Sequence, residues 1–246
     1  MGKLKERLRA VFDLVPPSSV ADIGTDHGYL ARELFLGRKS NFVIATDKNA
    51  GPCEAARRTL QDAGIGDQVE VRCGDGLTPL AVGEVETVVI AGMGGALIRE
   101  ILAASPKIAV SLTALVLQPQ NGGELLRRYL YEIGWHIDDE ALAAEGGLLY
   151  EIILARPGAE TMPSSLLLTL GPVLCKKKPP LFRERANELL QKCKRIQVGM
   201  ARSNRENTGD EYERIILRIK ELEALVDGEM PENHGNHGGD CASGLG

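Results

Sequence analysis

The sequence predicts an α/β fold in which a doubly wound parallel sheet is followed by a C-terminal hairpin of two α-helices. Between Val20 and Ala155, nearly continuous apolar segments alternate with segments of helical periodicity, the pattern of parallel strands covered by helices on both faces. After a segment rich in Pro and Lys come two amphipathic segments with a short polar linker, which is typical of a helical hairpin. A chain of 246 residues with 43% hydrophobic content can bury a full core for this fold.

The expected elements begin with a helix over residues 3–14, because apolar residues recur there at helical spacing and Pro16 and Pro17 follow. Strands are predicted at residues 20–23, 42–46, 68–73, 87–91, 114–118, 135–141 and 148–155. Helices are predicted between most of them, at about 29–36, 52–63, 96–104 and 123–133. Ligands of such sheets bind at the carboxyl ends of the strands, so functional residues are expected there.

Three parts are predicted along the chain: a first domain over residues 1–160, the helical hairpin over 161–227 and a disordered tail over 228–246. The hairpin helices are expected at about 181–199 and 210–226. The tail consists largely of Gly, Asn and His with little to bury. It contains potential metal ligands, His234, His237, Asp240 and Cys241, but we expect a flexible segment rather than a metal site.

Composition argues against several classes of protein. No apolar run approaches the roughly 18 residues that a membrane span needs, and charges interrupt the first 15 residues where a signal peptide would have an apolar core. The five cysteines are odd in number and lack a CxxC pair, so neither a disulfide framework nor a zinc ribbon is predicted. We therefore expect a cytoplasmic protein without a membrane or metal partner. The sequence does not establish the oligomeric state, for which a monomer is expected.

The net charge of −5 argues by itself against a nucleic-acid partner, but the charge is unevenly distributed. Residues 1–9 carry four Lys or Arg and one Glu, which gives a charge of +3. Residues 175–227 carry thirteen Lys or Arg and nine Asp or Glu, which gives +4. The rest of the chain therefore has a charge of −12. The basic flanks fit a phosphate backbone. Glu and Lys also interleave along the hairpin, so helices that are merely solvated fit equally well.

Polar and glycine-rich segments follow the first four predicted strands. In "DIGTDHG", Gly24 permits a tight turn and Gly28 permits close approach of the backbone to a ligand. The second strand ends at an acidic residue, which in such folds binds both hydroxyls of a ribose. The third strand is followed by "CGDG", in which Asp75 is expected beside the edge of an adenine. The fourth strand is followed by "AGMGG", which has little side-chain bulk. The candidate cofactor-binding residues are Asp22, Gly24, Asp26, His27, Gly28, Asp47, Lys48, Asp75, Gly76, Gly92 and Met93.

These four segments together predict a class I (Rossmann-like) methyltransferase that uses S-adenosylmethionine. A nicotinamide dinucleotide enzyme is the main alternative, but it would place Asp26 against a pyrophosphate anion. S-adenosylmethionine carries a sulfonium cation and an ammonium group, which carboxylates attract. The charges at the strand ends therefore favour the methyl donor.

Five segments of the chain resemble the TrmK family of bacterial tRNA (adenine-22, ring nitrogen 1) methyltransferases. They are "ADIGTDHGYL", "VVIAGMGGALIREIL", "LVLQPQ", "LLYEIILA" and "GPVLCKKKPPLFRER". The resemblance runs from residue 1 to about 227 and implies a methyltransferase domain, a coiled-coil-like helical hairpin and tRNA as the substrate. Asp47 stands where the family carries a glutamate, and the tail matches nothing in the family.

Methylation of ring nitrogen 1 requires an unpaired, aligned adenine more than a strong general base. Because the product is cationic, Asp26 is the candidate catalytic residue; it fits equally well as a cofactor ligand only. His27 fits a cofactor contact, a helix start or a proton carrier. In "LQPQNGG", Gln118, Gln120 and Asn121 are candidates for contacting the base, although a helix cap is the simpler explanation.

The candidate phosphate-binding residues are Lys176, Lys177, Lys178, Arg183 and Arg185. Methylation of exocyclic amines is disfavoured, since "AGMGG" replaces the (D/N/S)PP(Y/F) signature of that chemistry. Two alternative functions remain at this point: methylation of another RNA base, and a non-catalytic RNA-binding module. Calorimetry with S-adenosylmethionine separates the second from an enzyme.

Overall fold

The computed structural model describes residues 4–202 and 209–227. It contains two compact units, one that ends at Arg185 and one that begins at Ala186. The predicted boundary lay at residue 160, and the predicted tail over residues 228–246 lies outside the described residues.

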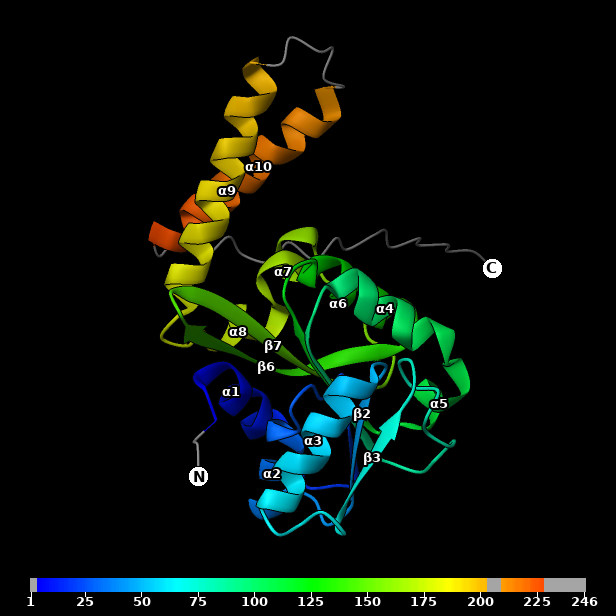
Figure 1. Cartoon of the computed structure of the whole chain (residues 1–246). Helices are drawn as coiled ribbons and strands as arrows, with labels where there is room; N and C mark the ends of the chain where they lie inside the picture. Colours follow the sequence, from blue (N-terminus) through cyan, green and yellow to red (C-terminus); the bar gives the residue numbers. More distant parts are fainter. Residues whose placement is uncertain (1–3, 203–208, 228–246) are drawn as a thin grey trace, which may run out of the picture. The chain divides into compact units, whose positions relative to one another are not determined.

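A seven-stranded sheet forms the centre of the first unit (Figure 1), with the strand order β3-β2-β1-β4-β5-β7-β6. Strands β1 to β5 are parallel, and β7 runs antiparallel to both β5 and β6. The strand order changes direction between β1 and β4, which makes their carboxyl ends the expected ligand-binding place. The strands are β1 (Val20–Ile23), β2 (Val43–Asp47), β3 (Val69–Cys73), β4 (Thr87–Met93), β5 (Ala114–Pro119), β6 (Trp135–Glu145) and β7 (Leu148–Pro157).

Each face of the sheet has its own apolar core, because successive side chains of a strand point to opposite faces. In β4, Val88 and Ile90 belong to one core and Val89 to the other. In β1, Ala21 shares the first core and Val20 the second. Both faces are covered, which explains why these strands are apolar at nearly every position.

Helices cover both faces, so the predicted doubly wound α/β fold is confirmed (Figure 1). On one face lie α1 (Glu6–Leu14), α2 (Tyr29–Leu36) and α3 (Ala50–Asp62). On the other lie α4 (Gly95–Ala104), α5 (Pro106–Ser111) and α6 (Gly123–Glu132). The short helices α7 (Ser165–Leu170) and α8 (Pro172–Lys177) follow β7 and were not expected from the Pro- and Lys-rich segment.

A buried ion cluster ties this segment to the sheet and explains why the first unit extends past residue 160. The guanidinium of Arg127 on α6 donates to Glu140 on β6 and Glu151 on β7, both at 2.7 Å, and to the backbone oxygen of Leu168 on α7 at 3.1 Å. Burial disfavours the charged form of Arg127, but the charges of Glu151 and Glu140 outweigh burial and the pKa of Arg127 is raised. Removing one member would leave a buried charge without its partner, which typically costs about 3–5 kcal/mol.

The second unit contains most of α9 (Phe182–Arg202) and all of α10 (Gly209–Asp227), which form the predicted hairpin (Figure 1). Their apolar stripes include the buried Cys193, Ile219 and Leu222. Lys194 and Glu223 form an ion pair of 2.7 Å between the two helices. No helix among residues 4–202 and 209–227 is long and apolar enough to cross a bilayer.

Cys53 and Cys73 form a disulfide, a pair that the expectation of no disulfide framework did not anticipate. Their Cα atoms lie 6.2 Å apart, within the range that a disulfide needs. The sequence separation of 20 residues hides this proximity. It arises from the parallel register, which places Asp47 at the end of β2 beside Cys73 at the end of β3.

Candidate active site

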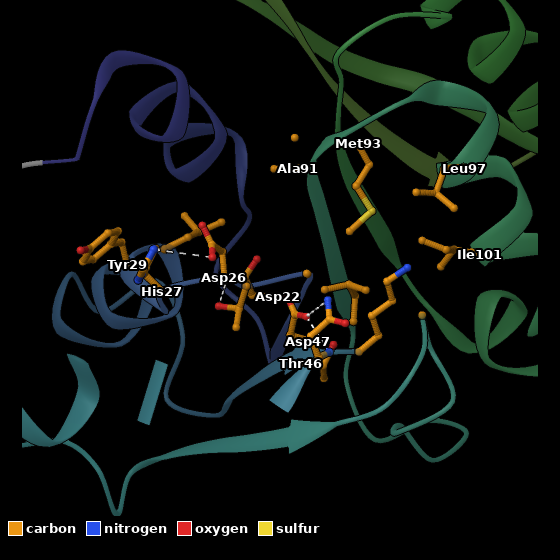
Figure 2. Close-up of a pocket in the computed structure, with 18 of the residues that line it drawn as sticks. Asp22, Asp26, His27, Tyr29, Thr46, Asp47, Ala91, Met93, Leu97 and Ile101 are labelled. Atoms are coloured by element: carbon orange, nitrogen blue, oxygen red, sulfur yellow. Dashed lines mark hydrogen bonds and ion pairs between the residues drawn. The ribbon is translucent and has the colours of Figure 1, made fainter. Parts of the chain in front are cut away.

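A cavity of about 360 Å³ opens at the carboxyl ends of β1, β2, β3 and β4. Figure 2 shows the carboxylates of Asp22, Asp26 and Asp47 on one side and the apolar side chains of Met93, Leu97 and Ile101 on the other. Ten of the eleven predicted cofactor-binding residues line it: Asp22, Gly24, Asp26, His27, Asp47, Lys48, Asp75, Gly76, Gly92 and Met93. The sequence motifs therefore meet in one place.

Gly24 forms the tight turn at the end of β1, with a φ of +72° that favours glycine. Its N–H donates to the backbone oxygen of Thr46 at 2.8 Å, which bends the chain over the end of β2. A Cβ at Gly24 would overlap the terminal methyl group of Met93. The glycine therefore allows the Met93 side chain to lie against the turn.

Gly28 is the one predicted cofactor-binding residue that does not line the cavity. It has a φ of +71° and precedes α2, and a Cβ there would lie 3.1 Å from Ala56 on α3. Close packing of α2 on α3 accounts for this glycine, and Tyr29 and Leu30, which follow it, line the cavity.

Asp26 occupies the left-handed region with a φ of +54°, which aspartate tolerates better than most residues but which still costs free energy. Its side chain is 71% exposed, and its Oδ1 lies 3.7 Å from Nε2 of His27. His27 in turn stacks on Tyr29 with ring centroids 5.5 Å apart. All three residues line the cavity. Its rim therefore carries a carboxylate on a strained backbone and a pair of stacked aromatic rings.

Asp22 is the buried carboxylate of the cavity. The hydroxyl of Thr25 donates to its Oδ2 at 2.7 Å. Burial raises the pKa of Asp22 to about 6, partly offset by the hydrogen bonds from Thr25 and the Ala31 backbone, while the nearby charge of Asp47 adds to the increase. A cation bound beside Asp22 would stabilise its ionised form.

Asp47 is oriented by the backbone N–H of Asn49, which donates to its Oδ1 at 2.9 Å. The backbone oxygen of Asp47 accepts from Gly74 N–H at 2.9 Å, which holds the loop that carries Asp75 next to Asp47. The hydroxyl of Thr46 is buried in the cavity wall and has no hydrogen-bond partner among residues 4–202 and 209–227. A buried unpaired hydroxyl is costly unless a ligand satisfies it.

Arg7 on α1 also lines the cavity and was missed. Its Nη1 donates at 2.7 Å to Oε1 of Gln118, which also accepts from Gly92 N–H at 3.1 Å. A signal existed in the sequence, because Arg7 lies three residues after Leu4 and four before Val11, on the apolar face of the predicted helix. A charge on a buried helix face requires a partner or a ligand.

Gln118 and Asn121 do not lie where the sequence placed them. Gln118 is fully buried and outside the cavity lining, so it supports Arg7 and Gly92 and does not reach a base. The side chain of Asn121 is also outside the lining, and its backbone oxygen accepts from Gly95 N–H at 2.8 Å. Gln120, between them, is exposed and lines the cavity. Of these three polar side chains, Gln120 is the one that lines the cavity.

The five predicted phosphate-binding residues divide into two groups. Lys177 pairs with Asp139, and Arg185 lies 3.6 Å from Glu151, so both have carboxylate partners within the first unit. Lys176, Lys178 and Arg183 are exposed, with no ion pair recorded within the described residues. These three are the better candidates for contact with an anionic partner.

Comparison with known proteins gives a consistent result. The family model described as TrmK, tRNA (adenine(22)-N(1))-methyltransferase, matches residues 20–223. The tRNA (adenine(22)-N(1))-methyltransferase of Bacillus subtilis is 32% identical over 233 residues, 92% of this chain and 98% of that protein. The crystal structure of B. subtilis TrmK has a TM-score of 0.81 at 31% identity and covers 92% of this chain and 99% of that chain. A Streptococcus pneumoniae structure in complex with S-adenosyl-L-methionine has a TM-score of 0.80 at 26% identity, covering 91% and 100%.

Proposed function

Because this chain belongs to the TrmK family, we infer that it transfers a methyl group from S-adenosylmethionine to ring nitrogen 1 of adenine 22 in tRNA. The observation that carries this inference is the family match over residues 20–223, which includes the loops of the cavity. The family expected from the sequence motifs is thereby confirmed.

The residues of the cavity fit S-adenosylmethionine. Four carboxylates line it, Asp22, Asp26, Asp47 and Asp75, and they match the sulfonium and ammonium charges of the cofactor and the hydroxyl donors of its ribose. We assign Asp47 to the ribose hydroxyls, Asp75 to the adenine edge and Asp22 to the cationic end. When bound, the cofactor supplies an electrophilic methyl group on a sulfonium.

Arg7 is assigned to the carboxylate of the methionine end of the cofactor. The cavity lining is acidic, and that carboxylate needs a cation. Arg7 reaches the end of the cavity formed by Gly92, because both bind Gln118 Oε1. Its planar guanidinium has further N–H groups with which to bind a carboxylate.

Asp26 is assigned to the developing positive charge on the methylated adenine. Ring nitrogen 1 has an in-plane lone pair and attacks without prior deprotonation, so the protein has to orient the base and stabilise the cation. Asp26 is exposed at the cavity rim, where an incoming base would meet it. The exposed Gln120 is the candidate for hydrogen bonding to the base edge.

We assign contact with the tRNA backbone to Lys176, Lys178 and Arg183. Lys176 lies in the last turn of α8, Lys178 directly follows α8, and Arg183 lies in the first turn of α9. We place the protein in the cytoplasm, where its substrate occurs, and expect a monomer.

The test is incubation of the purified chain with S-adenosylmethionine and unmodified tRNA, followed by nucleoside mass spectrometry. We expect 1-methyladenosine at position 22 and none in a tRNA with guanine at that position. The Asp47→Ala variant should lose roughly 2 kcal/mol of cofactor affinity, whereas Glu54→Ala, on the exposed face of α3, should bind normally. Methylation at another base, or none, would contradict the proposed function.

A further inference from the structure

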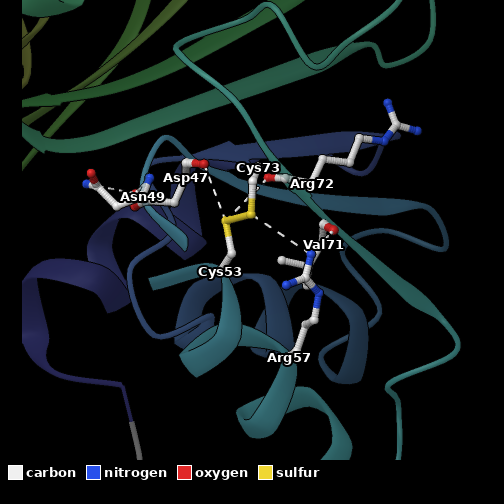
Figure 3. Close-up of a disulfide and its surroundings, with 7 residues drawn as sticks. All are labelled: Asp47, Asn49, Cys53, Arg57, Val71, Arg72 and Cys73. Atoms are coloured by element: carbon white, nitrogen blue, oxygen red, sulfur yellow. Dashed lines mark hydrogen bonds between the residues drawn. A yellow bond between two sulfur atoms is a disulfide. The ribbon is translucent and has the colours of Figure 1, made fainter. Parts of the chain in front are cut away.

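Cys53 and Cys73 form a disulfide beside Asp47, which lines the cavity (Figure 3). Cys53, in α3, has its Sγ 3.4 Å from the backbone oxygen of Asp47. Cys73 ends β3, opposite Asp47 in the register and two residues before Asp75. The disulfide therefore joins the two segments that carry the carboxylates assigned to the ribose and the adenine.

The two sulfurs differ in environment in a way that suits reversible chemistry. Cys53 is fully buried, whereas Cys73 is exposed. The Nη2 of Arg57 lies 3.9 Å from the Cys73 sulfur, and a neighbouring guanidinium stabilises a thiolate. Cys73 is thus the accessible member with a cation beside it, and Cys53 is placed to resolve a mixed disulfide formed on it.

The position of β3 makes the bond consequential for the site. β3 lies at the edge of the seven-stranded sheet, and within the described part of the chain it pairs with β2 alone. Near its carboxyl end, Gly74 N–H donates to the Asp47 backbone oxygen and Arg57 donates to the Val71 backbone oxygen at 3.1 Å. The disulfide adds a covalent link to these two hydrogen bonds. Without it, the loop that carries Asp75 has more freedom relative to Asp47.

We propose that the Cys53–Cys73 pair is a thiol-oxidation site that controls cofactor affinity by joining or releasing the segments that carry Asp47 and Asp75. The proposal rests on the proposed function, since it assumes that the cavity binds S-adenosylmethionine. In a reducing compartment such a bond is expected to be transient and regulatory. The oxidised protein binds the cofactor more tightly, because the two carboxylates are held in place before binding.

The oxidant is a low-molecular-weight disulfide. The Cys73 thiolate attacks one of its sulfurs, forms a mixed disulfide and releases one small thiolate. The deprotonated Cys53 sulfur then attacks the Cys73 sulfur, closes the protein disulfide and releases the second small thiolate. The two released thiolates take up the two protons that the cysteines gave up. Two protein thiols are oxidised while one small disulfide is reduced to two thiols.

The test uses the full chain equilibrated with oxidised or reduced glutathione, then alkylated with N-ethylmaleimide and mapped by peptide mass spectrometry. Calorimetry measures S-adenosylmethionine affinity in parallel samples without alkylation. We expect a Cys53–Cys73 cross-link in the oxidised sample, alkylation of both residues in the reduced one, and an affinity roughly three- to tenfold lower after reduction. Thermal unfolding should show that both samples are folded.

Two variants provide matched controls. Cys73→Ser changes an exposed side chain, so it should fold, bind like the reduced protein and no longer respond to glutathione. Cys193→Ser, on α9 in the second unit, should respond like the unaltered chain. A bond that never forms, one that glutathione does not reduce, or equal affinity in both states overturns the proposal. Failure to bind the cofactor in either state instead contradicts the proposed function itself.

Discussion

Nη1 of Arg7 donates a 2.7 Å hydrogen bond to Oε1 of Gln118 and thereby links the N-terminal helix to the end of β5 at the cavity. The same oxygen accepts from Gly92 N–H at 3.1 Å, and the Gln118 amide donates to the Pro119 backbone oxygen at 3.0 Å. Gln118 is thus oriented through both ends of its amide. The contact fixes a guanidinium at the mouth of an acidic cavity.

Replacement of Arg7 by Ala should weaken S-adenosylmethionine binding by about tenfold, because a charge-assisted hydrogen bond to the cofactor carboxylate is removed. Calorimetry measures the change. The control is Arg9→Ala on the same helix, since Arg9 is half exposed and pairs with Asp13 outside the cavity. If both variants bind like the original chain, Arg7 supports the fold and does not bind the cofactor.

Cofactor affinity should fall as the pH drops through about 6, the raised pKa of Asp22. Above this value Asp22 is ionised and attracts the cationic end of the cofactor; below it, the proton must leave before the cation binds. Linkage limits the loss to about tenfold per pH unit. Calorimetry from pH 5 to pH 8 measures the profile, and proton release on binding should appear near pH 6 in buffers of different ionisation enthalpy.

Asp22→Asn is the decisive variant for this profile. It should bind the cofactor weakly at pH 7.5 and lose most of the pH dependence, because an amide cannot ionise. The titration is repeated in His27→Gln as a control, since His27 also lines the cavity. A profile abolished by His27→Gln and retained by Asp22→Asn would assign the dependence to the imidazole instead.

The positions of many cavity residues were predictable because ligands of parallel sheets bind at the carboxyl ends of the strands. Asp22, Asp47 and Asp75 lie at or just after the carboxyl ends of successive strands, and strand ends can be found from apolar runs. Their meeting in one cavity follows from the strand order. The carboxylates and glycines were therefore found without knowledge of any tertiary contact.

The residues that were missed or misplaced depend on packing between distant segments. The place of Arg7 on the apolar face of the predicted helix signals a partner or a ligand, but no local pattern specifies that α1 packs against the sheet beside the cavity. Gln118 was expected at the last position of a strand over residues 114–118, but β5 continues to Pro119 and the Gln118 side chain is fully buried. The Cys53–Cys73 pair depends on the register of β2 with β3. Each of these required the three-dimensional arrangement.

Asp26→Asn should reduce the rate of methyl transfer at least tenfold with little change in cofactor affinity. The positive charge on the adenine develops only in the transition state, so its loss of stabilisation appears in turnover. Single-turnover kinetics with saturating tRNA measures the rate, and calorimetry measures the affinity. An equal loss in both quantities would identify Asp26 as a cofactor ligand alone.

Phosphate binding should involve Lys176 and Lys178, which are exposed and have no ion pair recorded in the described part of the chain. The double variant Lys176→Gln, Lys178→Gln should weaken tRNA binding without regard to base identity, because phosphate contacts position the substrate and do not specify it. The slope of the logarithm of the binding constant against the logarithm of the salt concentration should become shallower by about 0.9 for each duplex phosphate that is no longer neutralised. Cofactor affinity should stay unchanged, since neither lysine lines the cavity.

Lys177→Gln is the matched control, because Lys177 pairs with Asp139 and its charge is already neutralised within the protein. It should bind tRNA more tightly than the double variant and nearly retain the salt slope.

Truncation after Arg185, where the first compact unit ends, extends the test to the hairpin. The truncated chain keeps the Arg185 contact with Glu151 and should still bind the cofactor. The charge of +4 over residues 175–227 lies in residues 175–185, which the truncated chain retains, whereas residues 186–227 carry eight Lys or Arg and eight Asp or Glu. The truncated chain should therefore keep much of its tRNA affinity and salt slope, because Lys176, Lys178 and Arg183 remain. Loss of most of the tRNA affinity after truncation would instead place the tRNA contacts on the hairpin.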